Sequence, residues 1–370
     1  MAGYHPEVID IAHSRAYNNK YEATIRGDFV SPLLLSGRHI LAGGNMDYSY
    51  EITNRGVRIQ RVNSPMPCVA VPEEVEGYPV TELGPYALSG TLVEELYLPS
   101  HLKKIGAYAF YNCEKLRHLS CYGRAVDLGA GLFAGTGSLE SLDITLFDGE
   151  KSCLKELLSE LRQTLRVRVH QSQTKEARLI FPEYFEESVE NTPARILFVE
   201  THGCGHRYRY CFVQSQFQYS MYDGLFPHII VQEPEPLVTE LALGRLQYPL
   251  GLSPDHEQMY RGYVAEHWKT AGFLLICANR PNRSQSSNLE AGGIPWLVQN
   301  ILQPHPLDGG DTCFPEAFAV QLHELACLAQ KSNDTETVSW IMDYRHKLHI
   351  HDIHQKGGQP QVKPTRRFSL

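Results

Sequence analysis

The chain has 370 residues, a formal net charge of −8 and a hydrophobic share of 42 %. This length predicts two or three domains, and the hydrophobic share is ordinary for a folded chain. The negative charge argues against nucleic acid as a partner, because phosphates are neutralised by a basic face, and against anchoring to an anionic membrane for the same reason.

The N-terminal residues 1–18 show no basic leader followed by an apolar core. We therefore expect no signal peptide and a cytoplasmic location. Nine cysteines form an odd, scattered set, and Cys121, Cys277 and Cys327 fall at positions that should be buried. Cysteine used as a small apolar residue suits a reducing compartment. Residues 1–47 are interpreted as an N-terminal extension that folds onto the domain after it.

Two β-like runs at 48–52 and 57–62 flank a turn-like tetrapeptide at 53–56. This pattern predicts a β-hairpin. Because the hairpin precedes a series of repeats, we expect it to cap their first unit and to protect its strand edge.

The chain then repeats itself every 23 residues, as Leu96, Leu119 and Leu142 show. A second block recurs between these leucines as LGPYAL at 83–88, IGAYAF at 105–110 and LGAGLF at 128–133. Repetition at this period predicts a solenoid, in which neighbouring units cover one another's apolar faces. We predict four parallel rungs, the first of them at 69–71.

Side chains alternate between the two faces of a strand. Leu96, Leu119 and Leu142 are therefore predicted to point inward. The outward residues are predicted to form a rigid strip that contacts a protein partner. The residues of this strip are Tyr97, His118, Ser120, Tyr122 and Asp143.

Five leucines after the last rung follow helical spacing, from Leu154 to Leu165. This spacing predicts a capping helix at the far end of the solenoid. The solenoid with its hairpin cap and capping helix is thus expected to span residues 48–170.

The sequence PEEVEGYPVTELGPYALSG, followed by LYLPSHLKKIGAYAFYNCEKLRHLSCYG, resembles the bacterial leucine-rich repeats of the BspA type. The preceding YEITNRGVRIQRV is similar to the strand pair that commonly opens such arrays. The resemblance covers about residues 48–145. It implies a leucine-rich repeat fold and a role in binding proteins or surfaces, and it brings no shared catalytic residues.

Beyond the repeats, prolines divide residues 171–252 into short elements, which predicts a mixed α/β linker region. Residues 253–354 read as a helical repeat-like domain, in which Ser253 caps a helix and 322–346 forms two antiparallel helices. Residues 355–370 are expected to form a flexible tail. The predicted class is α+β: a short leucine-rich-repeat solenoid with a parallel β ladder, followed by a mainly α-helical C-terminal domain.

Four possible zinc ligands, His202, Cys204, His206 and Cys211, lie close together in the sequence. Their spacing differs from that of zinc fingers and ribbons, and a hairpin turning at the intervening glycines is the simpler interpretation. The alternating Arg-Tyr run at 207–210 is interpreted as an edge strand.

Two alternatives stay open for this stretch. One is a zinc-stabilised structural module, and the other is an enzyme whose site lies near 202–211 with Tyr208 and Tyr222. A cysteine nucleophile would need a base in contact and an oxyanion site, and the sequence indicates neither. The favoured interpretation is a non-enzymatic protein–protein interaction scaffold that uses no cofactor and binds neither nucleic acid nor membrane.

Overall fold

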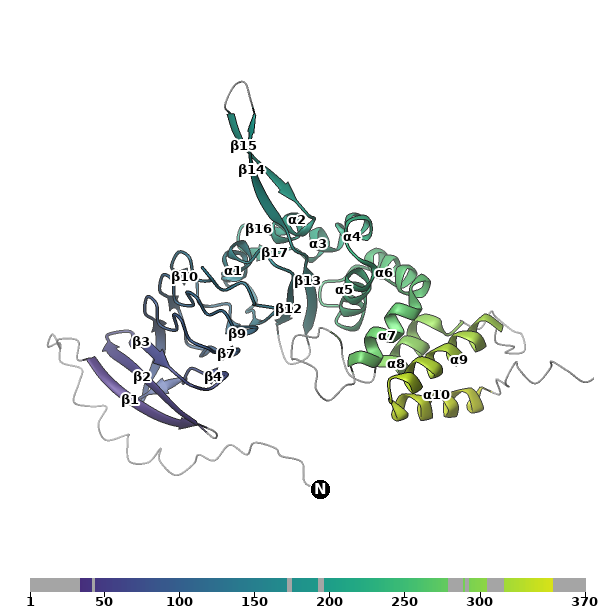
Figure 1. Ribbon diagram of the computed structural model, residues 1–370, viewed down its shortest axis with the longest axis horizontal. Coiled ribbons are helices and arrows are strands. Elements are labelled where there is room, and N and C mark those ends of the chain that lie inside the picture. Colours follow the sequence, from purple (N-terminus) through teal and green to yellow (C-terminus); the bar gives the residue numbers. More distant parts are fainter. Residues whose placement is uncertain are drawn as a thin grey trace, which may run out of the picture.

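The computed structural model describes residues 34–41, 44–171, 175–191, 196–278, 289, 293–304 and 316–348. The chain forms an elongated arc, with the repeats at one end and a group of helices at the other (Figure 1). A parallel β ladder followed by helices confirms the predicted α+β class. The tail predicted at 355–370 and most of the extension predicted at 1–47 lie outside the described residues.

The central sheet contains the rungs of the solenoid, in the order β13-β12-β11-β9-β7-β4. The side chains of Val69, Leu96, Leu119, Leu142 and Val167 are partners in register on successive parallel strands, and all are buried. The predicted inward alignment is therefore confirmed, with five parallel rungs in place of four. The strands are β4 (Cys68–Ala70), β7 (Glu95–Tyr97), β9 (His118–Tyr122), β11 (Ser141–Thr145), β12 (Leu165–His170) and the antiparallel β13 (Glu176–Phe181).

A second sheet forms another side of the solenoid, in the order β1-β2-β3-β6-β8-β10, with β5 paired to β6. The predicted hairpin is present as β2 and β3, and β1 adds a third antiparallel strand to it. The boundary predicted after residue 47 consequently falls inside β2. The strands are β1 (Leu34–Leu41), β2 (Gly44–Thr53), β3 (Gly56–Asn63), β5 (Glu74–Val75), β6 (Tyr78–Leu83), β8 (Lys104–Ile105) and β10 (Asp127–Leu128).

Successive coils approach each other so closely that glycine is required at one corner. A Cβ atom on Gly106 would lie 2.4 Å from the backbone nitrogen of Pro85, and one on Gly129 would lie 2.2 Å from that of Ala107. Both distances are shorter than van der Waals contact. The repeated glycine thus reflects the stacking distance between neighbouring coils.

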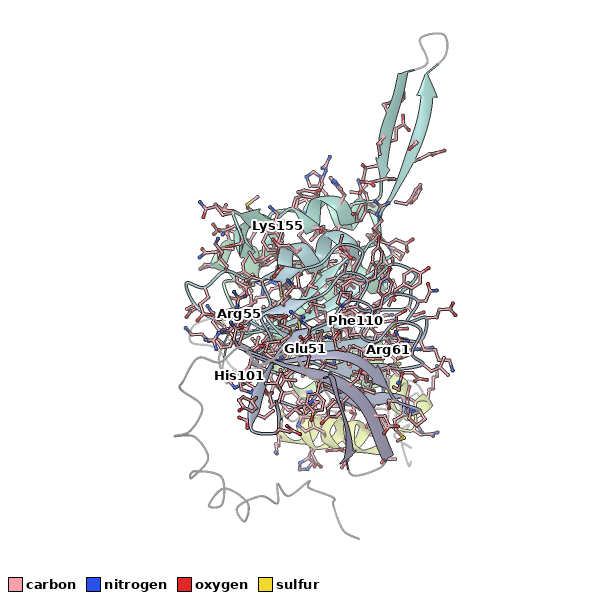
Figure 2. The ribbon with its side chains drawn as sticks, turned by 90° about the vertical axis from the view of Figure 1, so that its left-hand side faces the viewer. Glu51, Arg55, Arg61, His101, Phe110 and Lys155 are labelled. Atoms are coloured by element: carbon pink, nitrogen blue, oxygen red, sulfur yellow. The ribbon has the colours of Figure 1, made fainter. Side chains whose placement is uncertain are left out.

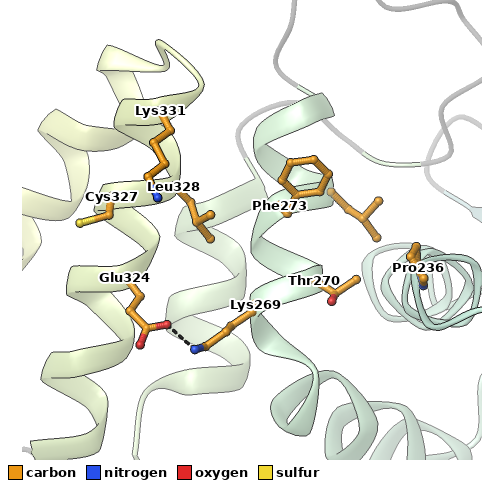
Figure 3. Close-up of a pocket in the computed structure, with 9 residues that line it drawn as sticks. Pro236, Lys269, Thr270, Phe273, Glu324, Cys327, Leu328 and Lys331 are labelled. Atoms are coloured by element: carbon orange, nitrogen blue, oxygen red, sulfur yellow. Dashed lines mark ion pairs between the residues drawn. The ribbon is translucent and has the colours of Figure 1, made fainter.

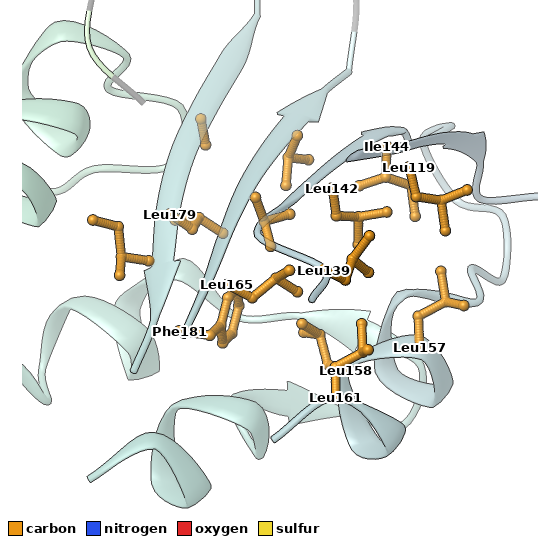
Figure 4. Close-up of a cluster of buried hydrophobic side chains, with 14 of the residues drawn as sticks. Leu119, Leu139, Leu142, Ile144, Leu157, Leu158, Leu161, Leu165, Leu179 and Phe181 are labelled. Carbon is orange, nitrogen blue, oxygen red and sulfur yellow. The ribbon is translucent and has the colours of Figure 1, made fainter. Parts of the chain in front are cut away.

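The leucines after the last repeat do not form one helix, which corrects the predicted capping helix. Helix α1 covers only Leu154–Glu160, and Leu165 is the first residue of β12. The leucines of α1 and the inward side of β12 join the same apolar cluster (Figure 4). Leu165 satisfies helical spacing and strand alternation equally well, and pairing with β11 decides in favour of the strand.

Strand β13 is the last strand of the ladder. Backbone N–H and C=O groups on its outer edge form hydrogen bonds with a side chain and with a loop. The phenol of Tyr222 donates to the carbonyl oxygen of Ile180 at 2.7 Å and accepts from the Ile180 amide at 2.8 Å. The Leu250 amide donates to the Glu176 carbonyl at 3.3 Å. These contacts prevent further strand addition at this end, because an unpaired edge is a template for association.

The remaining chain is mainly helical and begins with two short hairpins. The side chain of Ser253 accepts a hydrogen bond from the His256 amide at the start of α6, as the predicted cap requires. The hairpins are β14 (Phe185–Asn191) with β15 (Ile196–His202) and β16 (Phe212–Val213) with β17 (Gln216–Phe217). The helices are α2 (Gly205–Arg209), α3 (Tyr219–Asp223), α4 (Phe226–Gln232), α5 (Glu235–Gln247), α6 (Pro254–Glu266), α7 (Trp268–Ala278), α8 (Gly293–Leu297), the π-helix η1 (Val298–Leu302), α9 (Glu316–Lys331) and α10 (Thr335–Lys347).

Two arginines fasten the helical part to the end of the solenoid. Arg209 is 3 % exposed and donates to the carbonyl oxygens of Leu161 and Gln163, which precede β12, and to those of Pro182 and Gly205. Burial lowers its pKa to about 10, so the guanidinium stays charged at neutral pH. From β12, the guanidinium of Arg166 makes two hydrogen bonds of 2.7 and 2.8 Å to the carboxylate of Glu240 on α5. The junction between the two parts is therefore polar as well as apolar.

Within the described ranges, no helix combines the length and apolar character needed to cross a membrane.

The register predicts the effect of a charge on the middle rung. Leu119→Asp places an unpaired carboxylate among buried leucines, which costs several kcal/mol or forces the rung to open. We expect the free energy of unfolding, measured by urea titration and circular dichroism, to fall by roughly 3–5 kcal/mol.

Thr145→Asp is the matched control, because Thr145 is half-buried on the outward face of the next rung. We expect its free energy of unfolding to stay within about 1 kcal/mol of the parent chain. Equal stability of Leu119→Asp and Thr145→Asp would contradict the inward assignment.

Candidate functional site

The outward side chains of the central sheet form rows that cross the rungs. The middle row contains Tyr97, Ser120, Asp143 and Arg168, each paired with the next in register. Neighbouring members are about 4.8 Å apart, as in any sheet, and all four are half-buried. Tyr122 lies in the next row. We call Tyr97, Ser120, Tyr122 and Asp143 the contact strip.

His118, predicted to be exposed on this strip, is 3 % exposed and does not belong to its surface. Its Nδ1 lies 2.8 Å from Oγ of Ser141 on the next rung, and the ring of Tyr97 lies 5.5 Å away. Burial lowers the pKa of His118, and the nearby carboxylates of Asp143 and Glu95 oppose this shift. His118 thus supports the strip from below.

The contact between Ser141 and His118 pairs a hydroxyl with an imidazole, as in hydrolases. Ser141 is only 4 % exposed, however, so its hydroxyl is covered by neighbouring groups. A nucleophile must reach its substrate. This pair is therefore a structural hydrogen bond.

The charges on the strip are only partly compensated. Oδ2 of Asp143 lies 3.6 Å from the guanidinium of Arg168, whereas Oδ1 has no hydrogen-bond partner among the described residues. The Tyr97 hydroxyl donates to Glu95 at 3.2 Å. The Asp143 carboxylate thus has one oxygen paired with Arg168 and one buried oxygen without a hydrogen-bond partner among the described residues.

The helical part closes one end of the row that contains the strip. Arg178 on β13 follows Arg168 in register, contacts Glu176 at 2.7 Å and lies 3.6 Å from the ring centre of Tyr248, which follows α5. The arc shown in Figure 1 places these elements where solenoid and helices meet. The row remains partly exposed as far as Arg168 on β12, whose exposed fraction is 25 %, against 21 % for Asp143.

The four possible zinc ligands are not brought together. The described residues contain no group of three or more His, Cys, Asp or Glu side chains that could hold a metal ion. His202 stacks on Phe185, with 4.7 Å between ring centres, and His206 lies 4.6 Å from the ring of Tyr210. Both are ring contacts, and neither imidazole approaches a thiol group in them.

The two thiols of this stretch are buried in separate contacts. Burial, reinforced by Glu233 at 3.3 Å, raises the pKa of Cys204 to about 12. The pKa of Cys211 is raised to about 12 by burial and by the charge of Asp223. Thiols that stay protonated at neutral pH are poor nucleophiles and poor metal ligands. In this environment both thiols keep their protons at neutral pH.

The stretch also differs from the predicted local structure. Gly203 turns the chain after β15 with φ +88, and Gly205 begins helix α2, so the predicted hairpin and the predicted edge strand at 207–210 are both wrong. A Cβ atom on Gly205 would lie 1.9 Å from the carbonyl oxygen of Pro182. Glycine is needed there for close packing, and the helix is held by the buried Arg209.

Tyr208 and Tyr222, the other residues of the enzyme alternative, are fully buried. Tyr222 binds the backbone of β13, and the hydroxyl of Tyr208 has no hydrogen-bond partner among the described residues. Burial raises the pKa of both phenols. Both side chains thus belong to the apolar core.

Three tyrosines at the corner of the coils form an exposed cluster that sequence reasoning missed. Tyr86, Tyr108 and Tyr111 are 46, 37 and 38 % exposed, and the rings of Tyr86 and Tyr108 stack at 5.3 Å. Tyr86 and Tyr108 both have φ +57, a strained value for a bulky residue. Gly131 takes the same position in the next coil, under the ring of Tyr108. The sequence signal for this cluster is the repeat position that holds Tyr86, Tyr108 and Gly131 in successive coils.

An apolar groove of about 570 Å³ lies between α5, α7 and α9 (Figure 3). Phe273 and Leu328 line it, and an ion pair between Lys269 and Glu324 at 2.6 Å crosses its edge. Cys327 also borders the groove and lies 3.7 Å from His323 one helical turn away. Figure 3 shows the Cys327 sulfur pointing away from Phe273.

The buried imidazole predicts a dependence of stability on pH. The pKa of His118 in the folded chain lies below its unfolded value, so the unfolded chain binds more protons once the pH falls to about 6.5 and below. His118 therefore contributes a loss of stability on acidification. We expect His118→Asn to flatten the fall in unfolding free energy between pH 7.5 and pH 5.5, measured by urea titration.

His101→Asn is the control for this titration, because His101 is exposed and on the same solenoid. We expect it to leave the pH dependence unchanged. The opposite result would be a parent chain whose free energy of unfolding rises, relative to that of His118→Asn, as the pH falls. That result would contradict a His118 pKa lowered by burial.

Comparison with known proteins identifies the repeats. Residues 79–159 match the family described as "BspA type Leucine rich repeat region (6 copies)". A leucine-rich cell surface protein from Faecalibacterium prausnitzii is 15 % identical, with a TM-score of 0.24, over 39 % of this chain and 44 % of that one. A leucine-rich repeat protein from T. pallidum is 17 % identical, with a TM-score of 0.19, over 34 % of this chain and 79 % of that one.

This chain thus spans less than half the length of the F. prausnitzii protein. No curated protein matches it. The family match runs from β6 to α1, which lies between the fourth and fifth rungs of the solenoid, and it agrees with the resemblance drawn from the sequence. Residues 79–159 are a leucine-rich repeat region of the BspA type, and the part after them has no family assignment.

Proposed function

We propose that this chain is a non-enzymatic interaction scaffold that binds a protein partner along the contact strip. The observation that carries the proposal is the register of the rungs. It holds Tyr97, Ser120 and Asp143 in one row, while the residues next to each of them along the strand are buried: Leu96 and Leu98, Leu119 and Cys121, and Leu142 and Ile144. A face built in this way loses little conformational entropy when a partner binds.

The chemistry of the strip suits a protein surface. Tyr97 and Tyr122 supply rings with a polar tip, which is the usual composition of binding hot spots. Oδ1 of Asp143 accepts no hydrogen bond within the described residues. That oxygen is buried, so an N–H group or a guanidinium of a partner would contact the half-buried carboxylate at Oδ2, which lies 3.6 Å from Arg168. The strip therefore favours a partner with a donor flanked by apolar groups.

The absence of an enzymatic role is part of the proposal, and burial supports it. Cys204, Cys211, Tyr208 and Tyr222 face the core, and Ser141 is only 4 % exposed. The buried free thiols Cys113, Cys121 and Cys153 act as apolar core residues, which supports the cytoplasmic, reducing location proposed from the sequence.

The proposal is tested by removing the two tyrosine rings. A photo-crosslinking amino acid at position 122 first captures the partner in native cells, and the purified partner is then titrated against the variants. Tyr97→Ala with Tyr122→Ala should weaken binding at least about tenfold, because hot-spot tyrosines each contribute more than 1 kcal/mol.

Tyr78→Ala is the matched control, because Tyr78 is 40 % exposed and lies on β6, outside the central sheet. We expect it to leave both the affinity and the melting temperature unchanged. If the double variant keeps full affinity and an unchanged melting temperature, the strip is not the binding face.

A further inference from the structure

The hairpin of β14 and β15 projects from the body of the protein as an arm (Figures 1 and 2). Its two strands pair only with each other among the described residues. One ion pair, between Arg162 and Glu186 at 2.7 Å, ties its base to the solenoid end. A two-stranded ribbon alone in water is marginally stable at best. In the part of the chain that the structure describes, no other strand covers either long edge of this arm.

One face of the arm gathers carboxylates between aromatic rings. Glu187 and Glu200 are direct cross-strand partners, and Phe185 and His202 form the next pair on the same face. Phe198 lies on this face on the other side of the two glutamates. Phe185 is 56 % and Phe198 40 % exposed.

The two paired carboxylates destabilise the isolated arm. Like charges directly opposite each other destabilise a sheet. Among the described residues, His202 is the basic side chain paired with both of them, with Nε2 at 3.6 Å from Glu187 and 3.9 Å from Glu200, and it compensates their charge only when protonated. A cation placed between the two glutamates would remove the repulsion, and the neighbouring rings would contact its aliphatic or planar part.

We propose that this face binds an extended, basic segment of another protein, with a lysine or arginine held between Glu187 and Glu200. The backbone of the segment adds to an open edge of the arm as a third strand. Charge complementarity selects this occupant. A second copy of the same arm is disfavoured, because it would bring further glutamates against this pair.

The proposal is separate from the contact strip, since the arm and the strip share no residue. The probe is a synthetic fluorescent peptide of alternating lysine and valine, titrated against the full chain by fluorescence anisotropy. We expect saturable binding that weakens as salt is added. Glu187→Lys with Glu200→Lys should reduce the affinity at least about tenfold, because two attractive contacts become repulsive.

Glu94→Lys with Glu114→Lys is the matched control, because both glutamates are exposed on the solenoid and the net charge changes equally. This variant should keep nearly all of the affinity. An equal loss in both variants would overturn the proposal and show an effect of net charge alone. No binding of the lysine peptide to the parent chain would also overturn it.

Strand addition is tested with a second peptide of the same sequence in which alternate backbone nitrogens are methylated. Methylation removes the N–H donors of one edge and keeps every charge. We expect this peptide to bind at least about tenfold more weakly, since strand addition draws its affinity from main-chain hydrogen bonds. Equal binding of both peptides would overturn the third-strand geometry. A peptide with glutamate in place of lysine should not bind.

Discussion

The register between successive coils is the constraint on which the rest of this structure depends. One apolar residue of each rung, from Val69 to Val167, meets its counterpart on the next rung in a shared interior. Because a strand alternates its side chains, this alignment also places the intervening residues in rows on the other face. The glycine corners at Gly106 and Gly129 permit the same spacing on the other side of the coil. A shift by one residue would exchange the core and the contact strip.

A solenoid of few coils needs its ends covered, and here the two ends are covered differently. The first coil is covered by the β1–β3 strands, which continue the second sheet. The last is closed by β13 and by the helical part, through Tyr222 at the strand edge and Arg209 beneath it. Burying an arginine is costly, and removing its partners would leave an uncompensated charge. These polar contacts thus specify how the helical part joins the repeats.

The distribution of reactive groups separates the functional interpretations. Cys204, Cys211, Tyr208, Tyr222 and the Ser141–His118 pair are buried, and burial raises the pKa of these thiols and phenols and lowers that of the imidazole. The exposed side chains include tyrosine rings, carboxylates and the thiol of Cys68. Such groups suit recognition, because they offer contact area and charge without a poised nucleophile. Contact strip and arm are two such surfaces, on different elements.

The sequence by itself determined the repeat, the inward leucines, the opening hairpin and the cap at Ser253, because each follows from contacts between residues close in sequence or one repeat apart. Tertiary structure alone decided the strand at Leu165, the burial of His118 and the helix at 205–209. Leu165 fits both periodicities until β11 pairs with its strand, and His118 is covered by Tyr97 and Ser141 from the neighbouring rungs. Arg209 is held by carbonyl groups more than forty residues earlier in the chain. The alternation of side chains along a strand predicts the face on which each one lies. Its exposure depends on which neighbouring groups cover it in the folded chain.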